Sequence, residues 1–173
     1  MAESVAKVAR RINATAEEGK DSLDLSNCNL ISFPDGVFKV LSGVTENIRT
    51  VSLADNEMKT ISAKFCSIFT QLRELDLHGN VLTKLPDAVV QLEHLSSIDL
   101  SGNRFSQFPE KLTELKELER ISLEGNTITD FPAERLFSMP SLKVLDLRAN
   151  PVSAETLGAL QTPPHIQLLV SEP

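Results

Sequence analysis

The sequence predicts an α/β solenoid, in which short parallel strands stack along a concave face and short helical, 3-10 or irregular segments form the convex face. The first observation is an internal repeat: residues 72–86 and residues 95–109 carry apolar residues, one asparagine and one proline at the same offsets, 23 residues apart. The second is that the polar position of this repeat recurs along the chain, at Cys28, Asn56, Asn80, Asn103, Asn126 and Asn150. Such repeats indicate a solenoid, because one repeat cannot bury its own apolar face and must stack on its neighbours.

Each repeat contributes a short strand, marked by two apolar residues on either side of a third residue, as in Leu75 and Leu77. Side chains alternate across a strand, so both apolar residues point into the solenoid and the residue between them points out. The equivalent pairs are Leu23 and Leu25, Val51 and Leu53, Ile98 and Leu100, Ile121 and Leu123, and Leu145 and Leu147. Stacked pairs give a continuous core, in which each leucine contributes about 1.5–3 kcal/mol.

The repeated asparagine follows each strand and is expected to turn the chain away from it. Its side chain has two donors and one acceptor oxygen, which can satisfy backbone groups that the turn leaves unpaired. An unsatisfied buried polar group costs about 1–3 kcal/mol, so the asparagines are predicted to form a ladder through the solenoid. Cys28 stands at the head of this ladder, and we expect both Cys28 and Cys66 to be buried and unreactive.

The pattern L-x-x-L-x-L-x-x-N/C-x-L resembles the leucine-rich repeat. It covers residues 20 to about 160 in six copies. The continuation after the asparagine, Leu85-Pro86 followed by Leu92, resembles the subclass found in intracellular, Ras-associated and scaffold proteins. The resemblance implies a leucine-rich-repeat horseshoe, a small intracellular stand-alone member of the family, a protein-interaction role and no catalytic residues.

The repeats divide the chain into three parts of one domain. Residues 1–19 are predicted to be an N-terminal helical cap, residues 20–150 hold the six repeats, and residues 151–173 form a C-terminal cap and tail. Within the last part, Ser153 is a predicted N-cap of a short helix. Residues 166–170 alternate between apolar and other residues, which predicts a final strand.

The N-terminal helix is expected to carry an apolar stripe on one face. The stripe consists of Val5, Val8, Ile12 and Ala16, which follow helical spacing. The first repeat of a solenoid has an open apolar end, so we interpret the helix as its cover. A partner-binding amphipathic helix is the alternative interpretation.

Composition excludes several classes of partner. The net charge is −7 and the isoelectric point is about 5.0, with lysines and arginines scattered singly apart from Arg10 and Arg11. Proteins that bind nucleic acids usually carry a basic patch or stripe, so neither a nucleic acid nor an anionic membrane is expected as a partner. No apolar run approaches the ~18 residues that a membrane span needs.

The cysteines and the N-terminus indicate the compartment. Two cysteines do not form a disulfide framework, and the N-terminus lacks the apolar core of a secretory signal. We therefore expect a cytoplasmic protein, with the nucleus left open, and not a secreted one. Asn13 begins a glycosylation sequon, which only a chain in the secretory pathway could use, so we expect no role for it.

The variable residues beside the strand leucines line the concave face and are the candidates for recognition. The candidate partner-binding residues are Glu74, Asp76, His78, Asp99, Arg120, Glu124, Asp146 and Arg148. This face is small, polar and acidic in the first four repeats and of mixed charge in the last two, which favours docking of a protein with a basic or polar segment. The alternatives are a strand face that serves solubility alone, and a structural or regulatory subunit that uses the convex face or the caps. We expect a monomer.

A catalytic or metal site is conceivable around His78, which shares a strand with Glu74 and Asp76 and lies beside Asp99. An open strand face exposes these groups to water and gives little scope for shifting their pKa values. A metal site needs three or four converging ligands, and His78 is the one histidine in this region. The sequence therefore predicts no enzyme activity, no cofactor and no metal.

Overall fold

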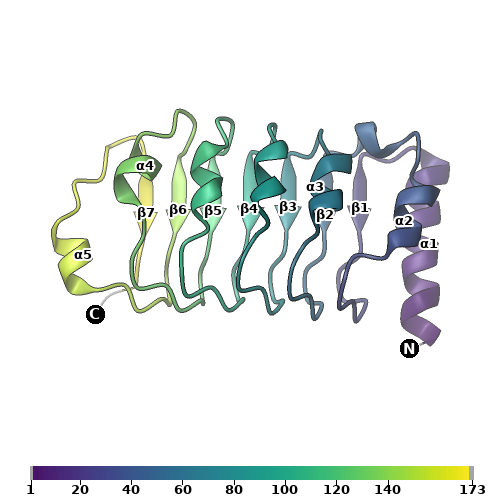
Figure 1. Ribbon diagram of the computed structural model, residues 1–173, viewed down its shortest axis with the longest axis horizontal. Helices are drawn as coiled ribbons and strands as arrows, with labels where there is room; N and C mark the ends of the chain where they lie inside the picture. Colours follow the sequence, from purple (N-terminus) through teal and green to yellow (C-terminus); the bar gives the residue numbers. More distant parts are fainter. Residues whose placement is uncertain (1, 172–173) are drawn as a thin grey trace.

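The computed structural model describes residues 2–171. These residues form one seven-stranded parallel sheet, in which the strands lie side by side in sequence order (Figure 1). The strands are β1 (Ser22–Asp24), β2 (Thr50–Ser52), β3 (Glu74–Asp76), β4 (Ser97–Asp99), β5 (Arg120–Ser122), β6 (Val144–Asp146) and β7 (Gln167–Leu169). The predicted solenoid with a parallel sheet is confirmed.

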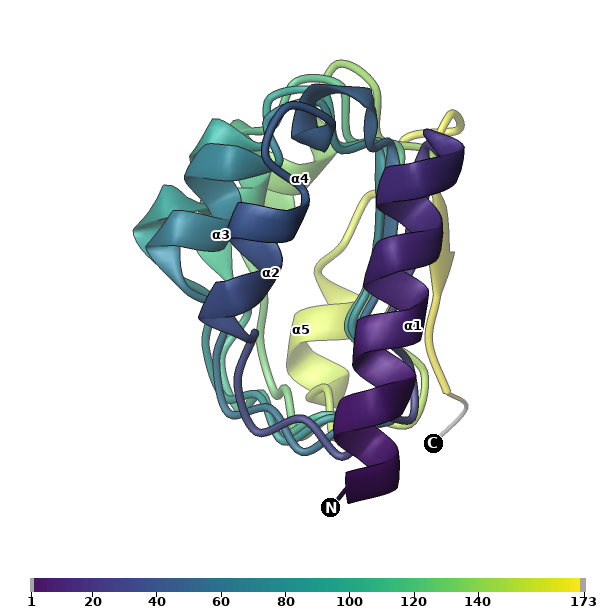
Figure 2. The ribbon, with the colours of Figure 1, turned by 90° about the vertical axis from the view of Figure 1, so that its right-hand side faces the viewer.

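A 17-residue helix, α1 (Ala2–Glu18), precedes the first strand. Short helices follow in the connections between strands: α2 (Asp35–Val40), α3 (Ala63–Ile68), α4 (Ala133–Phe137) and α5 (Ala154–Gly158), with 3-10 helices η1 (Thr45–Asn47), η2 (Asp87–Gln91) and η3 (Glu110–Glu114). In the end-on view, α2, α3 and α4 lie on the side opposite the strands and form the convex layer, whereas α1 lies against the strand layer (Figure 2). The mixture of α-helix and 3-10 helix on the convex side agrees with the predicted one.

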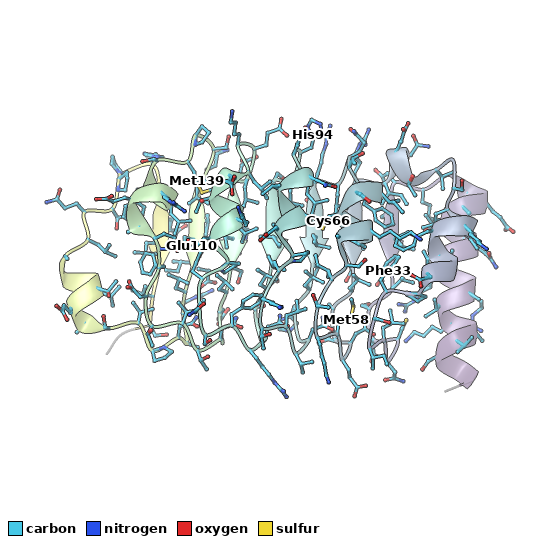
Figure 3. The ribbon with its side chains drawn as sticks, viewed as in Figure 1. Phe33, Met58, Cys66, His94, Glu110 and Met139 are labelled. Carbon is cyan, nitrogen blue, oxygen red and sulfur yellow. The ribbon has the colours of Figure 1, made fainter. Side chains whose placement is uncertain are left out.

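The strand register aligns equivalent residues of all repeats. Leu75 pairs with Val51 on one side and with Ile98 on the other, and the same step continues to Leu168 in β7. These residues point inward and are largely buried, together with the second apolar residue of each pair. Side chains from both layers, including Met58, Cys66 and Met139, fill the space between strands and convex helices (Figure 3).

The predicted asparagine ladder is confirmed. Asn103 Nδ2 donates to Leu77 O (2.9 Å) in the preceding repeat and to Leu100 O (3.0 Å) in its own, and its Oδ1 accepts from Leu82 N (3.0 Å). The same three kinds of bond recur at Asn56, Asn80, Asn126 and Asn150. Cys28 ends the ladder as a buried residue, whose N–H donates to Asn56 Oδ1 (2.9 Å).

The residue before each ladder position has a left-handed backbone. The φ values are 53° at Asn27, 56° at Asp55, 71° at Gly79, 64° at Gly102, 73° at Gly125 and 56° at Ala149. Glycine adopts this conformation without steric cost, and asparagine and aspartate tolerate it better than other residues. Ala149 is therefore the one position of this set where the residue type opposes the turn.

The N-terminal helix α1 covers the end of the first repeat. Val8 and Ile12 are buried against the core and Ala16 packs on it, as the predicted stripe requires. The prediction is wrong for Val5, which is 70% exposed. Val5 is not covered by the first repeat, and Thr15 is buried on α1 in addition to Val8 and Ile12.

A polar stripe on α1 pairs with the free edge of β1. Its three members, spaced by four residues, donate side-chain hydrogen bonds to main-chain oxygens of the first strand and the turn after it. These are Lys7 to Asn27 O (2.7 Å), Arg11 to Ser26 O (2.7 Å) and to Asp24 O (3.3 Å), and Thr15 to Ser22 O (2.9 Å). Residues four apart share one helix face, so α1 meets the strand edge along its length.

The C-terminal end is closed by smaller elements. Ser153 Oγ accepts from Thr156 N (3.1 Å) at the start of α5, which confirms the predicted N-cap. The predicted last strand is present as β7, which pairs with β6 in the register of the other strands.

Candidate concave-face interface

The strand register brings the predicted site residues onto one face in three rows. Each row runs across the sheet, so residues distant in sequence become lateral neighbours. The first row contains Glu74, Ser97 and Arg120, the second contains Asp76, Asp99, Ser122 and Asp146, and the third contains His78, Ser101, Glu124 and Arg148. All eight predicted residues therefore lie in rows on the same side of the sheet.

The acids of the second, third and fourth repeats crowd together. Asp76 is half-buried, and its Oδ1 accepts from the main-chain N–H of His78 (3.0 Å). Burial raises the pKa of Asp76, and the negative charges of Asp99 and Asp55 raise this pKa further. Burial and the neighbouring acids thus destabilise the ionised form of Asp76, and a cation bound on this surface would stabilise it.

A chain of hydrogen bonds joins three side chains of this surface. Ser101 Oγ lies 2.5 Å from Asp99 Oδ1 and 2.7 Å from His78 Nδ1. An ionised carboxylate can only accept, so the single hydroxyl proton of Ser101 goes to Asp99. His78 Nδ1 must then carry the proton that Ser101 Oγ accepts, and the imidazole is fixed over the third row.

The acids of the last repeats are paired within the chain. Arg148 donates to both oxygens of Asp146, from Nε to Oδ1 (3.0 Å) and from Nη2 to Oδ2 (2.7 Å), and Nη2 also lies 3.6 Å from Glu124 Oε2. Burial alone would raise the pKa of Asp146, but the hydrogen bonds and charge of Arg148 lower it overall. The hydrogen bond and the negative charge of Asp146 in turn raise the pKa of Arg148.

This pairing corrects the role expected for Asp146. Its side chain is 1% exposed beneath Arg148, so it cannot itself contact a partner. Asp146 positions Arg148, which remains exposed together with Arg120.

Asp55 is a residue of this surface that the sequence reasoning missed. It precedes the ladder residue Asn56, at the turn position that glycine occupies in the next three repeats, and is exposed. A Cβ at Gly79 would come within 2.5 Å of Asp55 Oδ1, so the glycine makes room for this carboxylate. An acid at a turn position that glycine fills in the next three repeats was the signal that could have identified it.

The geometry does not fit a catalytic serine. In a hydrolytic triad, the histidine stands between the serine and the acid and takes the serine proton. Here Ser101 stands between His78 and Asp99 and gives its proton to the acid, so no base activates it. Within residues 2–171, no group of three or more histidine, cysteine, aspartate or glutamate side chains is placed to hold a metal ion.

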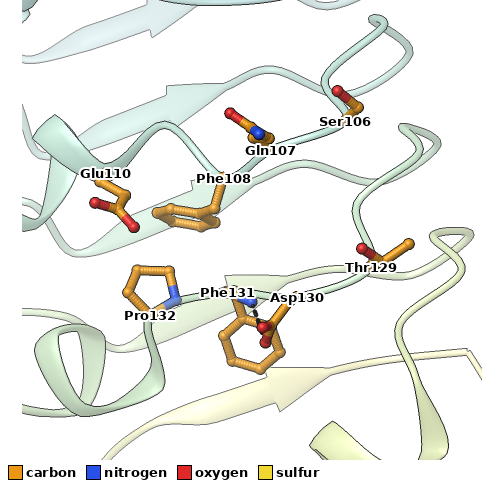
Figure 4. Close-up of a pocket in the computed structure, with 8 residues that line it drawn as sticks. All are labelled: Ser106, Gln107, Phe108, Glu110, Thr129, Asp130, Phe131 and Pro132. Carbon is orange, nitrogen blue, oxygen red and sulfur yellow. Dashed lines mark hydrogen bonds between the residues drawn. The ribbon is translucent and has the colours of Figure 1, made fainter.

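A hollow of about 660 Å³ lies away from the concave face, between the fourth and fifth repeats (Figure 4). It is lined by Ser106, Gln107, Phe108, Glu110, Thr129, Asp130, Phe131 and Pro132. Its two acids already have partners: Asp130 Oδ1 accepts from Phe131 N (2.9 Å), and Glu110 lies 3.6 Å from Arg135. Both carboxylates of the hollow are therefore engaged within the chain.

Comparison with known proteins identifies the family. The model of the leucine-rich repeat region matches residues 24–167, which is most of the chain. The chain belongs to the leucine-rich-repeat family. This leucine-rich-repeat chain is 59% identical to leucine-rich repeat-containing protein 20 of Mus musculus over 155 residues, which cover 90% of this chain and 84% of that protein.

Solved leucine-rich-repeat structures share the fold. A protein of Leptospira interrogans superposes with a TM-score of 0.70 at 28% identity, over 85% of this chain and 36% of that one. The leucine-rich-repeat domain of the type III effector XopL gives a TM-score of 0.74 at 22% identity, over 98% of this chain and 58% of that one. Leucine-rich repeats generally mediate protein–protein interaction, and such proteins are generally non-enzymatic scaffolds. Among the described helices of this chain, none is long and apolar enough to cross a membrane.

Proposed function

We propose that this leucine-rich-repeat chain is a non-enzymatic interaction module, which binds a basic segment of a protein partner on the N-terminal half of its concave face. The acidic half-face, as we name this surface, consists of Asp55, Glu74, Asp76 and Asp99. Within residues 2–171, none of these acids forms a salt bridge with a lysine or arginine, and the imidazole Nε2 of His78 lies 4.0 Å from Asp55 Oδ1. This lack of counter-charge carries the proposal.

The two ends of the concave face support the choice of this half. At the first strand, Asp24 already has Arg11 of α1 at 3.6 Å, and at the last repeats Arg148 holds Asp146 and Glu124. Only the acids between these ends keep their charge free for a partner. Arg120, Glu124 and Arg148 then form the boundary of the site, where charges of both signs discriminate between partners.

Charge complementarity acts mainly on the rate of association and on specificity. The acidic half-face lies on a chain of net charge −7, so the field of the whole molecule adds to that of the site. Small side chains flank the acids, namely Ser52, Ser97 and Ser101. They leave room for the backbone of an extended partner segment to approach the strands.

Proximity labelling in cells tests the proposal. The test variant carries Glu74→Lys, Asp76→Lys and Asp99→Lys together. The control carries Glu93→Lys, Glu114→Lys and Glu117→Lys, three exposed positions away from the concave face. We expect a defined subset of labelled proteins to be lost with the test variant and retained with the control. An unchanged set of labelled proteins would rule out binding through the acidic half-face.

The remaining expectations belong to the same proposal. The chain acts in the cytoplasm without a cofactor, a metal or a catalytic step. Residues 1–19 and residues 151–173 serve as the two caps of the repeats in 20–150. The pairing of α1 with the β1 edge supports the first of these roles.

The alternative function is that of a subunit which docks into a larger assembly through its N-terminal end. One observation favours it: the exposed large hydrophobic side chains Val5, Ile31 and Val40 all belong to α1 and the first repeat. Replacing Val5 and Ile31 by serine should then release a partner that the acidic half-face variant retains. If both variants retain the same partners, neither surface is the docking site.

A further inference from the structure

The first row of the concave face holds two opposite charges at a fixed spacing. Glu74 on β3 pairs laterally with Ser97 on β4, and Ser97 pairs with Arg120 on β5, the next strand of the sheet (Figure 1). Both charged residues are exposed, and the serine between them is small and partly buried. Neighbouring strands lie about 4.7–4.9 Å apart, so Glu74 and Arg120 project from points about 9.4–9.8 Å apart along the row.

Arg120 is left as an unpaired cation because other cations occupy the acids around it. Glu119, directly before Arg120, lies 2.6 Å from Lys143 Nζ. Glu124, which follows the same strand, lies 3.6 Å from Arg148, and Arg148 also holds the buried acid of the next strand. In the described part of the chain, Arg120 therefore forms no salt bridge, and its guanidinium group is available to an anion of a partner.

The two ends of this row suit two different partner groups. At one end, Asp76 and Asp99 accompany Glu74 in the neighbouring row, so one partner cation can approach several carboxylates. At the other end, the planar guanidinium of Arg120 presents paired donors that match the two oxygens of a carboxylate. The face therefore offers a site for a cation and a site for a carboxylate, two strands apart.

We propose that the partner segment is dipolar and binds in the polyproline II conformation, with a lysine or arginine on the acidic half-face and an aspartate or glutamate, three residues away, on Arg120. This inference rests on the proposed function and names the kind of segment that the concave face accepts. The segment crosses β3, β4 and β5 along the first row, over Ser97.

The conformation follows from the spacing. A polyproline II helix has three residues per turn and rises about 3.1 Å per residue, so every third side chain returns to the same face after about 9.3 Å. This length matches the two strand spacings between Glu74 and Arg120. An extended β-strand places side chains of one face about 6.6 Å or about 13.2 Å apart, which matches two strand spacings less well. The main-chain groups of β3, β4 and β5 already pair with neighbouring strands, so a segment with a solvated backbone suits this surface.

Arg120 also sets which segments are rejected. A segment that is basic throughout would place a cation against Arg120, and this repulsion would oppose its binding although the acidic half-face attracts it. A dipolar segment with another spacing can form the contact with the acids or the contact with Arg120, but not both at once. The row therefore selects both the sign and the spacing of the partner's charges.

NMR titration of the full chain with synthetic proline-rich peptides tests the spacing. The matched peptide carries a lysine and a glutamate separated by two prolines, a second peptide has one proline between them, and a two-lysine peptide replaces the glutamate by lysine. We expect the matched peptide to bind about threefold to fivefold more tightly than either of the others, the gain typical of one exposed ion pair. Equal dissociation constants for the matched and the one-proline peptide would overturn the inference.

A helical peptide is the rival to the polyproline II segment. An α-helix returns to the same face after seven residues, or about 10.5 Å, which is also close to two strand spacings. An alanine-based peptide with lysine and glutamate seven residues apart therefore enters the same titration. Tighter binding of this peptide than of the matched one would overturn the polyproline II conformation.

A charge exchange at Arg120 tests the carboxylate end. Arg120→Glu should weaken binding of the matched peptide and strengthen binding of the two-lysine peptide, so that the order of the two is reversed. Arg104→Glu makes the same change of charge at an exposed residue outside the three rows and should leave the order as it is. An order that Arg120→Glu does not alter would overturn the role of Arg120.

The triple variant Glu74→Lys, Asp76→Lys and Asp99→Lys separates this inference from the proposed function. Both hold if the matched peptide binds best and the triple variant abolishes its binding. If all lysine-containing peptides bind equally and the triple variant abolishes their binding, the dipolar segment is wrong and the acidic half-face remains the binding site. If no peptide binds at millimolar concentration, or if the triple variant binds them as the unaltered chain does, both are wrong.

Discussion

Asn103 Oδ1 accepts the main-chain N–H of Leu82 across 3.0 Å, and these two residues belong to different repeats. The amide of the same asparagine donates to carbonyls of both repeats. Each ladder asparagine is therefore a link between neighbouring repeats as well as a turn within one, and a single substitution should weaken the stack on both sides.

Asn103→Ala should lower the free energy of unfolding by about 3 kcal/mol, because it leaves buried carbonyls and the Leu82 N–H without partners. Arg104→Ala changes the next residue, whose side chain is exposed, and should cost less than about 0.5 kcal/mol. Urea unfolding of both variants measures the difference. Equal losses would mean that the ladder is not a main source of stability.

At two equivalent left-handed turns, replacing alanine by glycine and replacing glycine by alanine should have opposite effects on stability. Ala149→Gly should stabilise the fold slightly, by up to about 1 kcal/mol, because alanine is strained at a φ of 56°. Gly125→Ala should destabilise it by about 1–2 kcal/mol, although a Cβ there meets nothing closer than 3.7 Å. Thermal melting of the two variants decides, and a shift in the same direction for both would contradict the backbone explanation.

Asp76 and Asp24 occupy equivalent strand positions and should respond to pH with opposite signs. Burial, Asp99 and Asp55 raise the folded-state pKa of Asp76, so its ionisation destabilises the fold as the pH rises through that pKa. Asp76→Asn should therefore raise the melting temperature at pH 7, and this gain should vanish as the pH falls below about 4.

For Asp24, burial alone would raise the pKa, but hydrogen bonds from Ser26 and the charge of Arg11 lower it overall. Its contribution is present above the unfolded-state pKa and is lost as the pH falls through the folded-state pKa. Asp24→Asn should lower the melting temperature at pH 7 and have little effect in acid. Melting curves from pH 3 to pH 7 that move both variants the same way would refute these assignments.

The role of α1 can be tested by removing it. Deletion of residues 1–18 exposes Leu23, Leu25 and the outward carbonyls of β1, so the shortened chain should aggregate or unfold. Arg11→Ala should cost about 1–2 kcal/mol, because it removes the guanidinium donor of the Ser26 carbonyl, which then keeps only the weak thiol donor of Cys28. A truncated chain that remains monomeric and folded, but loses one partner, would instead favour an interaction helix.

Sequence predicted the strands, their register and the asparagine ladder, because those features depend on residue types that recur at fixed offsets. It failed at Val5, because helical spacing predicts which residues share a face but not which of them the rest of the fold covers. The left-handed turns were only partly visible: Gly79 indicates a turn by its residue type, whereas Asp55 and Ala149 can be recognised only by alignment with the glycines of the other repeats.

The candidate site shows a second limit of sequence reasoning. Asp99 and Asp146 stand in the same row and each lies between two buried apolar residues, yet Asp99 is half-buried without a salt bridge and Asp146 is 1% exposed beneath Arg148. That difference depends on the side-chain conformation of one arginine. Which acids remain free for recognition therefore required the structure.

The association rate with a partner recovered by proximity labelling tests the central claim most directly. Exposed charges are screened over about 10 Å at 0.1 M salt, so electrostatic steering is strongly salt-dependent. We predict that the rate falls at least about tenfold between about 0.05 M and about 0.5 M salt, and that Glu74→Lys with Asp76→Lys and Asp99→Lys lowers it as much at the lower concentration. An association rate that is independent of both salt and the triple substitution would contradict the account.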